Sequence, residues 1–98
     1  MTRDEVLRRL KASEPELREL GLGKLYLFGS VARGDPAAKD VDLVYEACRA
    51  SKLGFLELTG AMIRLEEILG RPVDLVDRRN LHRRIRPRVE AEMIEIYR

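Results

Sequence analysis

The chain has little of several residue types that mark particular classes of protein. It has no tryptophan, one histidine, two phenylalanines and three tyrosines. Its one cysteine, Cys48, excludes an internal disulfide and fits a reducing compartment. There is no run of about 18 apolar residues that could cross a membrane, and the first residues lack the apolar stretch of a signal peptide. We therefore expect a cytoplasmic protein without a membrane span.

Charged residues are abundant but nearly balanced. They make up 37% of the 98 residues, with 19 basic against 17 acidic side chains and a net charge of +2. The length fits a single domain over residues 1–98. Basic side chains crowd one stretch: Arg78, Arg79, Arg83, Arg84, Arg86 and Arg88. They could form a solvated face or reach phosphate or an acidic partner. Since aromatics are few and no nucleic-acid module is recognisable, direct nucleic-acid binding is the least favoured function.

The most informative stretch runs from residue 25 to residue 44. The apolar run Leu25–Phe28 predicts a buried strand. Gly29 follows, and a glycine lets the backbone turn sharply and approach a ligand closely. Ser30 is expected to cap the short helical turn that Gly34 ends. Free backbone N–H groups at such a turn suit a phosphate.

Carboxylates then follow in a strand pattern. Because side chains alternate across a strand, Asp40 and Asp42 are predicted to share one face. A third strand, Val73–Val76, carries Asp74, where a charge is costly unless it is paired or binds a metal. Mg²⁺ commonly binds one or two carboxylates together with substrate phosphates. An ordinary turn and solvated strand positions remain the alternative, but the combination favours a magnesium–nucleotide site.

These motifs together resemble a known signature, that of the polymerase-beta-type nucleotidyltransferases. The similar segments are Gly29-Ser30, Ala32-Arg33-Gly34-Asp35, Asp40-Val41-Asp42-Leu43 and Val73-Asp74-Leu75-Val76. They are most similar to the minimal nucleotidyltransferases, which are often antitoxins paired with HEPN-domain toxins. Two features depart from the pattern: the spacer of residues 31–39 is one residue shorter than usual, and Val31 stands where a basic residue is common.

The resemblance implies an α+β (α/β) fold, in which helices pack on a small mixed sheet like the palm of polymerase beta. It implies transfer of a nucleoside monophosphate, AMP from ATP, to a hydroxyl on a partner HEPN toxin, with two Mg²⁺ ions. The catalytic and metal-binding residues would be Asp40, Asp42 and Asp74, and the phosphate-binding residues Gly29, Ser30 and Arg33. Two alternatives stay open: a non-catalytic antitoxin that masks a helical partner, and nucleotidyl transfer to a small molecule.

Helices are predicted around these motifs. Their expected ranges are 3–12, 14–20, 53–69 and a last helix from about Pro87, whose apolar stripe would include Val89, Met93 and Ile96. Two capping boxes are expected, from Thr2 with Glu5 and from Ser13 with Glu16. In the long helix, Phe55 and Met62 are expected in the core, and Gly60 is expected to mark a close crossing over a strand.

Polar positions complete the expectations. Residues 46–52 are polar and are predicted to end the strand that begins at Asp40. Leu22 is expected to continue the apolar stripe of the helix over 14–20. Asp77 is predicted to cap the turn after the third strand, and His82 to be an exposed loop residue, since no metal-ligand spacing surrounds it.

Overall fold

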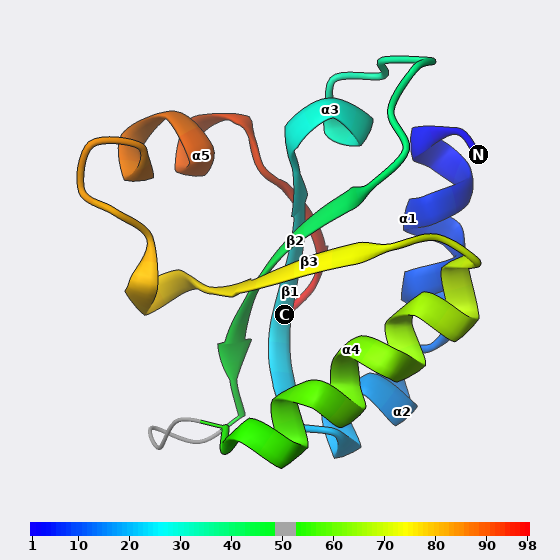
Figure 1. Cartoon of the computed structure of the whole chain (residues 1–98), viewed down its shortest axis with the longest axis vertical. Helices are drawn as coiled ribbons and strands as arrows, with labels where there is room; N and C mark the ends of the chain where they lie inside the picture. Colours follow the sequence, from blue (N-terminus) through cyan, green and yellow to red (C-terminus); the bar gives the residue numbers. More distant parts are fainter. Residues whose placement is uncertain (49–52) are drawn as a thin grey trace.

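The computed structural model describes residues 1–48 and 53–98, which form one four-stranded sheet with helices on both faces (Figure 1). The elements are α1 (Arg3–Ala12), α2 (Glu14–Glu19), β1 (Leu22–Phe28), α3 (Gly29–Ala32), β2 (Val41–Ala47), α4 (Phe55–Leu69), β3 (Val73–Asp77), the 3₁₀ turn η1 (Arg78–Asn80), α5 (Arg86–Glu92) and β4 (Ile94–Tyr97). No helix within the described ranges is long and apolar enough to span a membrane.

The sheet is mixed, with strand order β3-β2-β1-β4. β1 runs antiparallel to β2 and to β4, whereas β2 and β3 are parallel. The parallel pair is joined through α4, because parallel neighbours need a long crossover. The mixed sheet with packed helices confirms the predicted fold class.

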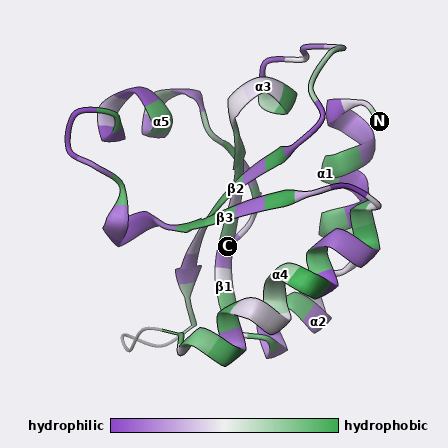
Figure 2. Ribbon diagram, in the orientation of Figure 1, coloured by the Kyte–Doolittle hydropathy of each residue, from purple (hydrophilic) through white to green (hydrophobic). Residues whose placement is uncertain are grey.

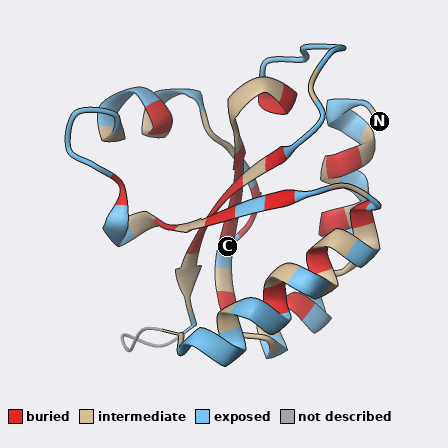
Figure 3. Ribbon diagram, viewed as in Figure 1, coloured by how far each residue is buried: buried red, intermediate tan, exposed pale blue. Residues whose placement is uncertain are grey.

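The main core lies on one face of the sheet, beneath α1, α2 and α4 (Figure 1). Each of these helices buries an apolar stripe against the strands, and the buried residues they contribute are Val6, Leu10, Leu17, Ala61, Leu65 and Leu69. A smaller cluster on the opposite face brings Val89 of α5 and Leu81 onto Tyr26 and Val44. Buried segments therefore concentrate along the strands and the inner sides of the helices (Figure 3).

Most predicted elements are present, with small shifts at their ends. The helix over 3–12 has the expected bounds, and the Thr2 side chain accepts a hydrogen bond from the Glu5 backbone N–H, which is one half of the predicted capping box. The Glu5 carboxylate accepts a hydrogen bond from Arg9. Asp77 likewise accepts from the Arg79 N–H, which confirms its capping role. Ser13 makes no side-chain cap bond, so the second capping box is wrong.

The C-terminal prediction is also wrong. The last helix ends at Glu92, and residues 94–97 form β4, which pairs with β1. Ile96 and Tyr97 are buried in the main core there. A short apolar stretch is compatible with both a helix and a strand, and the free edge of β1 decides in favour of the strand. Leu22, at the other end of β1, pairs with Ala47 of β2 and so belongs to the strand and not to the preceding helix.

Three further expectations need correction. Phe55 at the start of α4 is exposed and not in the core, whereas Met62 packs against the core as predicted. Gly60 crosses no strand closely, because no described atom lies within 4 Å of the position that a Cβ would take. Pairing continues through Glu46 to Ala47, so the polar segment does not end the strand at residue 46, and residues 49–52 lie outside the described residues.

Candidate active site

Asp42 and Asp74 are register partners in the parallel pair β2–β3. Neighbouring strands lie about 4.8 Å apart, and paired residues present their side chains on the same face. The flanking residues Val41, Leu43 and Leu75 are buried in the main core. Since side chains alternate along a strand, that burial directs both aspartates to the opposite face, where α5 lies. Hydrophobic packing thus brings two carboxylates from distant parts of the sequence side by side.

The local electrostatics agree with this proximity. The pKa of the Asp42 carboxyl is raised above its usual value, first by partial burial, then by the negative charges of Asp74 and Asp40. Asp40 lies one residue before β2 begins and is exposed, as is Asp74. Asp40 is therefore not a strand residue, although its charge acts on Asp42. A bound cation would remove the cost of ionising Asp42 beside two like charges.

Gly29 places the turn after β1 directly against Asp42. It has φ +76°, a conformation that side-chain-bearing residues rarely adopt. A Cβ at this position would overlap with Oδ2 of Asp42 and lie 3.1 Å from its Cγ. The turn needs a glycine for both reasons, and the two predicted motifs meet at this contact.

Ser30 lies in the first turn of α3 and not at its cap. The helix begins at Gly29, with Phe28 in the cap position, so the prediction that Ser30 caps the turn is wrong. The next two residues, Val31 and Ala32, are buried. Ser30 is half-buried, and its hydroxyl makes no hydrogen bond to any described residue. The first N–H groups of a helix also lack partners within the helix, so this turn offers hydrogen-bond donors.

Arg33 connects the turn to α5. Its Nη1 lies 3.5 Å from Oε2 of Glu92, and the positive charge of Arg33 lowers the pKa of Asp42. A cationic side chain is therefore close to the paired carboxylates. The sequence gives no signal for Glu92, because its approach to Arg33 depends on how α5 packs over the sheet.

Part of the basic cluster stabilises the fold. Arg78 donates hydrogen bonds to Glu46 at 3.0 Å and to Glu90 at 2.6 Å, and its guanidinium lies over the ring of Tyr26. Arg79 pairs with the buried carboxylate of Asp77. These contacts attach η1 and α5 to the sheet. Two other arginines, Arg83 and Arg84, are exposed. His82 is exposed as predicted, and its Nδ1 accepts a hydrogen bond from the Arg84 N–H.

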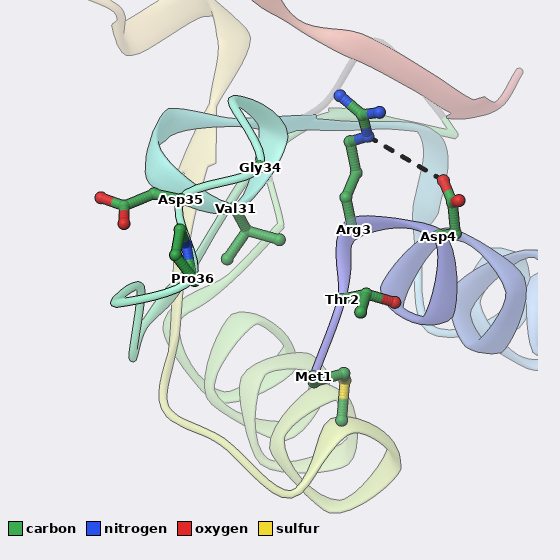
Figure 4. A pocket seen from close by; sticks show the side chains of 8 residues that line it. All are labelled: Met1, Thr2, Arg3, Asp4, Val31, Gly34, Asp35 and Pro36. Carbon is green, nitrogen blue, oxygen red and sulfur yellow. Dashed lines mark ion pairs between the residues drawn. The ribbon is translucent and has the colours of Figure 1, made fainter.

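A cavity of about 400 Å³ lies between α3 and the start of α1 (Figure 4). It is lined by Met1, Thr2, Arg3, Asp4, Val31, Gly34, Asp35 and Pro36. Arg3 closes one side by donating a hydrogen bond to the Ala32 carbonyl at 3.2 Å. None of the three predicted carboxylates lines this cavity, so it is distinct from the candidate site.

The donor set of the site suits magnesium with a phosphate ligand. Within the described ranges, no three acidic, histidine or cysteine side chains form a ready-made metal centre. Mg²⁺ does not require one, because it usually keeps waters and binds through one or two carboxylates and substrate phosphates. The pair Asp42 and Asp74, with Asp40 nearby, fits that mode.

Comparison with known proteins places these features in a family. The model for "Polymerase beta, Nucleotidyltransferase" matches residues 17–98, a range that contains the whole candidate site. The chain belongs to this nucleotidyltransferase family. The resemblance inferred from the glycine turn and the aspartates is thereby confirmed, and so is the class of reaction that the family name states.

Individual relatives match along most of their length. A protein of Methanocaldococcus jannaschii described as a "putative protein adenylyltransferase" is 29% identical over 83 residues, which are 84% of this chain and 87% of that protein. A solved structure described as a "putative minimal nucleotidyltransferase" has a TM-score of 0.78 and 30% identity, over 96% of this chain and 95% of the other.

A third match is a complex of the tri-AMPylated Shewanella oneidensis HEPN toxin with its MNT antitoxin. It has a TM-score of 0.67 and 23% identity, and the alignment covers 93% of this chain and 71% of the other. At this identity the similarity is evidence for a shared fold.

Proposed function

We propose that this nucleotidyltransferase transfers AMP from ATP to a hydroxyl group of a helical HEPN-type protein and acts as its antitoxin in the cytoplasm. The observation that carries the proposal is the side-by-side placement of Asp42 and Asp74 against the Gly29 turn. Paired carboxylates beside a set of free hydrogen-bond donors suit a nucleoside triphosphate with its magnesium. The single domain over residues 1–98 would hold all of these groups.

The residues of the turn would bind the triphosphate. The backbone N–H groups at Gly29 and Ser30, with the free Ser30 hydroxyl, would hold the β- and γ-phosphates. Arg33 would exchange its contact with Glu92 for a phosphate oxygen, since a guanidinium binds phosphate through two parallel hydrogen bonds. With the β- and γ-phosphates held there, the α-phosphate would lie on the side of the carboxylates.

The carboxylates would bind the Mg²⁺ ions and accept the proton of the acceptor hydroxyl. Asp40, Asp42 and Asp74 would bind two Mg²⁺ ions, which neutralise phosphate charge and favour ionisation of the acceptor hydroxyl. The exposed Asp74 would accept the hydroxyl proton. The acceptor oxygen then forms its bond to the α-phosphorus, the bond to the β-phosphate oxygen breaks, and pyrophosphate leaves. The protein mainly orients groups and balances charge, which suits a small domain.

The acceptor is proposed to be a hydroxyl of another protein. The face that carries Asp74 and Asp40 is open, because both side chains are exposed and α5 covers only the part of the sheet near Tyr26 and Val44. An acceptor on a protein surface could complete the cleft. The similarity to an antitoxin solved with its AMPylated HEPN toxin, and to a protein described as an adenylyltransferase, supports this acceptor over a small molecule.

A labelling experiment tests the proposal. The chain is incubated with α-labelled ATP, Mg²⁺ and a helical HEPN-type protein as candidate acceptor, and label on that protein is measured. We expect labelling that requires Mg²⁺ and is lost in Asp42→Asn. Glu19→Gln is the control, because Glu19 is an exposed carboxylate at the end of α2, on the opposite face of the sheet.

The same variants separate transfer from simple masking. If Asp40→Asn/Asp42→Asn still neutralises the toxic partner as well as the wild type does, the antitoxin acts by binding alone and the proposed reaction is wrong. Neutralisation that disappears together with labelling supports transfer. Binding of the variant to its partner, measured in parallel, shows that the substitution has not removed the interface.

A further inference from the structure

The outer side of α4 carries apolar side chains that the described structure leaves uncovered. Phe55 and Leu56 are 82% and 80% exposed, and Ile63 is 55% exposed. Leu56 and Ile63 are seven residues apart, which is close to two helical turns, so they form one stripe. The stripe lies opposite the side that buries Ala61, Leu65 and Leu69. The start of α4 is hydrophobic in Figure 2 and exposed in Figure 3.

Gly60 lies in the middle of this stripe. A glycine in a helix interior lowers stability, so it needs a structural reason. The described part of the chain supplies no such reason, because apart from the backbone of α4 itself no atom lies within 4 Å of the position of a Cβ at Gly60. Gly60 follows Leu56 by four residues and precedes Ile63 by three, so it is on the same face. A missing side chain there allows another backbone to approach α4 closely.

We propose that α4 packs antiparallel against α4 of a second copy of this chain, across a two-fold axis at Gly60. With about 1.5 Å of rise per residue, Leu56 of one copy then lies within about 1.5 Å along the axis of Ile63 of the other. Glu57 precedes Gly60 by three residues and Arg64 follows it by four, and both lie along one edge of the stripe. The two-fold axis therefore places Glu57 of each copy beside Arg64 of the other.

This self-complementarity favours a second copy over an unrelated partner. A two-fold interface requires a patch that complements itself, with opposite charges at symmetric positions. Glu57 makes no ion pair with any described residue, whereas Arg64 already contacts Glu16 and Glu67. The pairing would give Glu57 a partner and cover both apolar side chains. α4 packs on the face opposite Asp42 and Asp74, so both sites of the dimer stay open.

Sedimentation of the full chain tests the dimer. The interface of one helix face is small, so we expect dissociation in the micromolar range, seen as a rise in mass over roughly 10 μM to 1 mM. Gly60→Leu should raise the dissociation constant at least tenfold while its melting temperature stays equal or rises, because the new side chain meets open space in the monomer. Glu57→Arg should weaken the dimer similarly through repulsion with Arg64.

Exchanging the two charges tests the Glu57–Arg64 contact directly. Glu57→Arg/Arg64→Glu should recover most of the dimer lost in Glu57→Arg, whereas Glu19→Arg, on the exposed end of α2, should change nothing. Monomer at all concentrations would overturn the proposal, as would a dimer that Gly60→Leu and Glu57→Arg leave intact. A monomeric chain in which Glu57→Arg or Gly60→Leu loses binding to the helical partner would also overturn it. ATP binding should persist in each α4 variant, so this test is independent of the proposed transferase activity.

Discussion

Asp42 on β2 and Asp74 on β3 are paired residues of two parallel strands, although 31 positions separate them in sequence. Their neighbours on both strands are buried in the core, so the aspartates cannot turn inward. The pKa of Asp42 is raised by burial and by the charges of Asp74 and Asp40. The fold therefore holds like charges together at a cost in stability, which a cation would offset.

Asp42→Asn is expected to stabilise the chain in the absence of divalent ions. The amide has nearly the same size and removes the charge that faces Asp74 and Asp40. We expect the melting temperature to rise by a few degrees, since about 1 kcal/mol corresponds to about 4–8 °C in a domain of this length. ATP with Mg²⁺ should raise the melting temperature of the wild type and not of the variant. An equal ligand response in both would contradict the proposed site.

The charge of Asp42 should also make stability depend on pH. Its pKa is raised above the ordinary value of 3.8, so the folded chain holds a proton that the unfolded chain has already lost. The contribution of Asp42 to the free energy of unfolding therefore falls as the pH rises from the ordinary pKa to the raised pKa of the folded chain. The informative quantity is the difference between wild type and Asp42→Asn, because other carboxylates, such as Glu14, have lowered pKa values and act in the opposite direction. The variant's advantage should grow with pH in metal-free urea titrations; a constant difference would contradict the argument.

Gly29→Ala should disturb both stability and the site. Gly29 and Gly34 share φ +76°, so alanine is strained by about 1 kcal/mol at either position. Only at Gly29 would the new Cβ overlap with the Asp42 carboxylate, because nothing lies within 4 Å at Gly34. Gly29→Ala should therefore lower the melting temperature more than Gly34→Ala and reduce labelling at least tenfold. Equal effects at the two glycines would show that the contact with Asp42 has no role.

Arg33→Ala is expected to weaken ATP binding. The side chain pairs with Glu92, its charge lowers the pKa of Asp42, and it is the proposed contact of the triphosphate. A lost charged hydrogen bond of about 1.5–3 kcal/mol corresponds to a roughly 10- to 150-fold higher Kd for ATP with Mg²⁺, measured by calorimetry. Glu92→Gln should leave binding equal or tighter, since it frees Arg33 from its ion pair. Tighter binding in Arg33→Ala would exclude the proposed contact.

The sequence was most informative where burial and periodicity agree. The alternation of Val41 to Leu43 placed Asp42 on the correct face, and the apolar run before Gly29 located β1. The glycine turn and the charged strand positions of the candidate site could be predicted because each motif carries its own physical requirement: a glycine for the turn and a charge within a strand. The register that pairs Asp42 with Asp74 could not be read from the sequence, because it depends on how α4 crosses the sheet.

Predictions failed where long-range packing decides the outcome. Ile96 suits a helix stripe or a strand equally, and only the unpaired edge of β1 selects the strand. Phe55 has the spacing of a core residue, but it is the first residue of α4 and its side chain is exposed. Arg78 is one of the arginines that could reach a phosphate, but its guanidinium is held by Glu46 and Glu90. For Ile96 and Arg78 the deciding partner is distant in sequence.

Tyr97→Phe should show how much β4 contributes to stability. The buried Tyr97 hydroxyl donates a hydrogen bond of 2.7 Å to the Leu22 carbonyl. This bond links the end of β4 to the start of β1. Phenylalanine fills the same space but leaves a buried acceptor unpaired, which costs about 1–3 kcal/mol. We expect a loss of at least 4 °C in melting temperature, given about 4–8 °C per kcal/mol. Tyr26→Phe is the matched control, because its hydroxyl bond to the partly exposed Glu46 is longer, at 3.3 Å, and should contribute less. Similar losses in the two variants would mean that removing a hydroxyl, and not the attachment of β4, determines the effect.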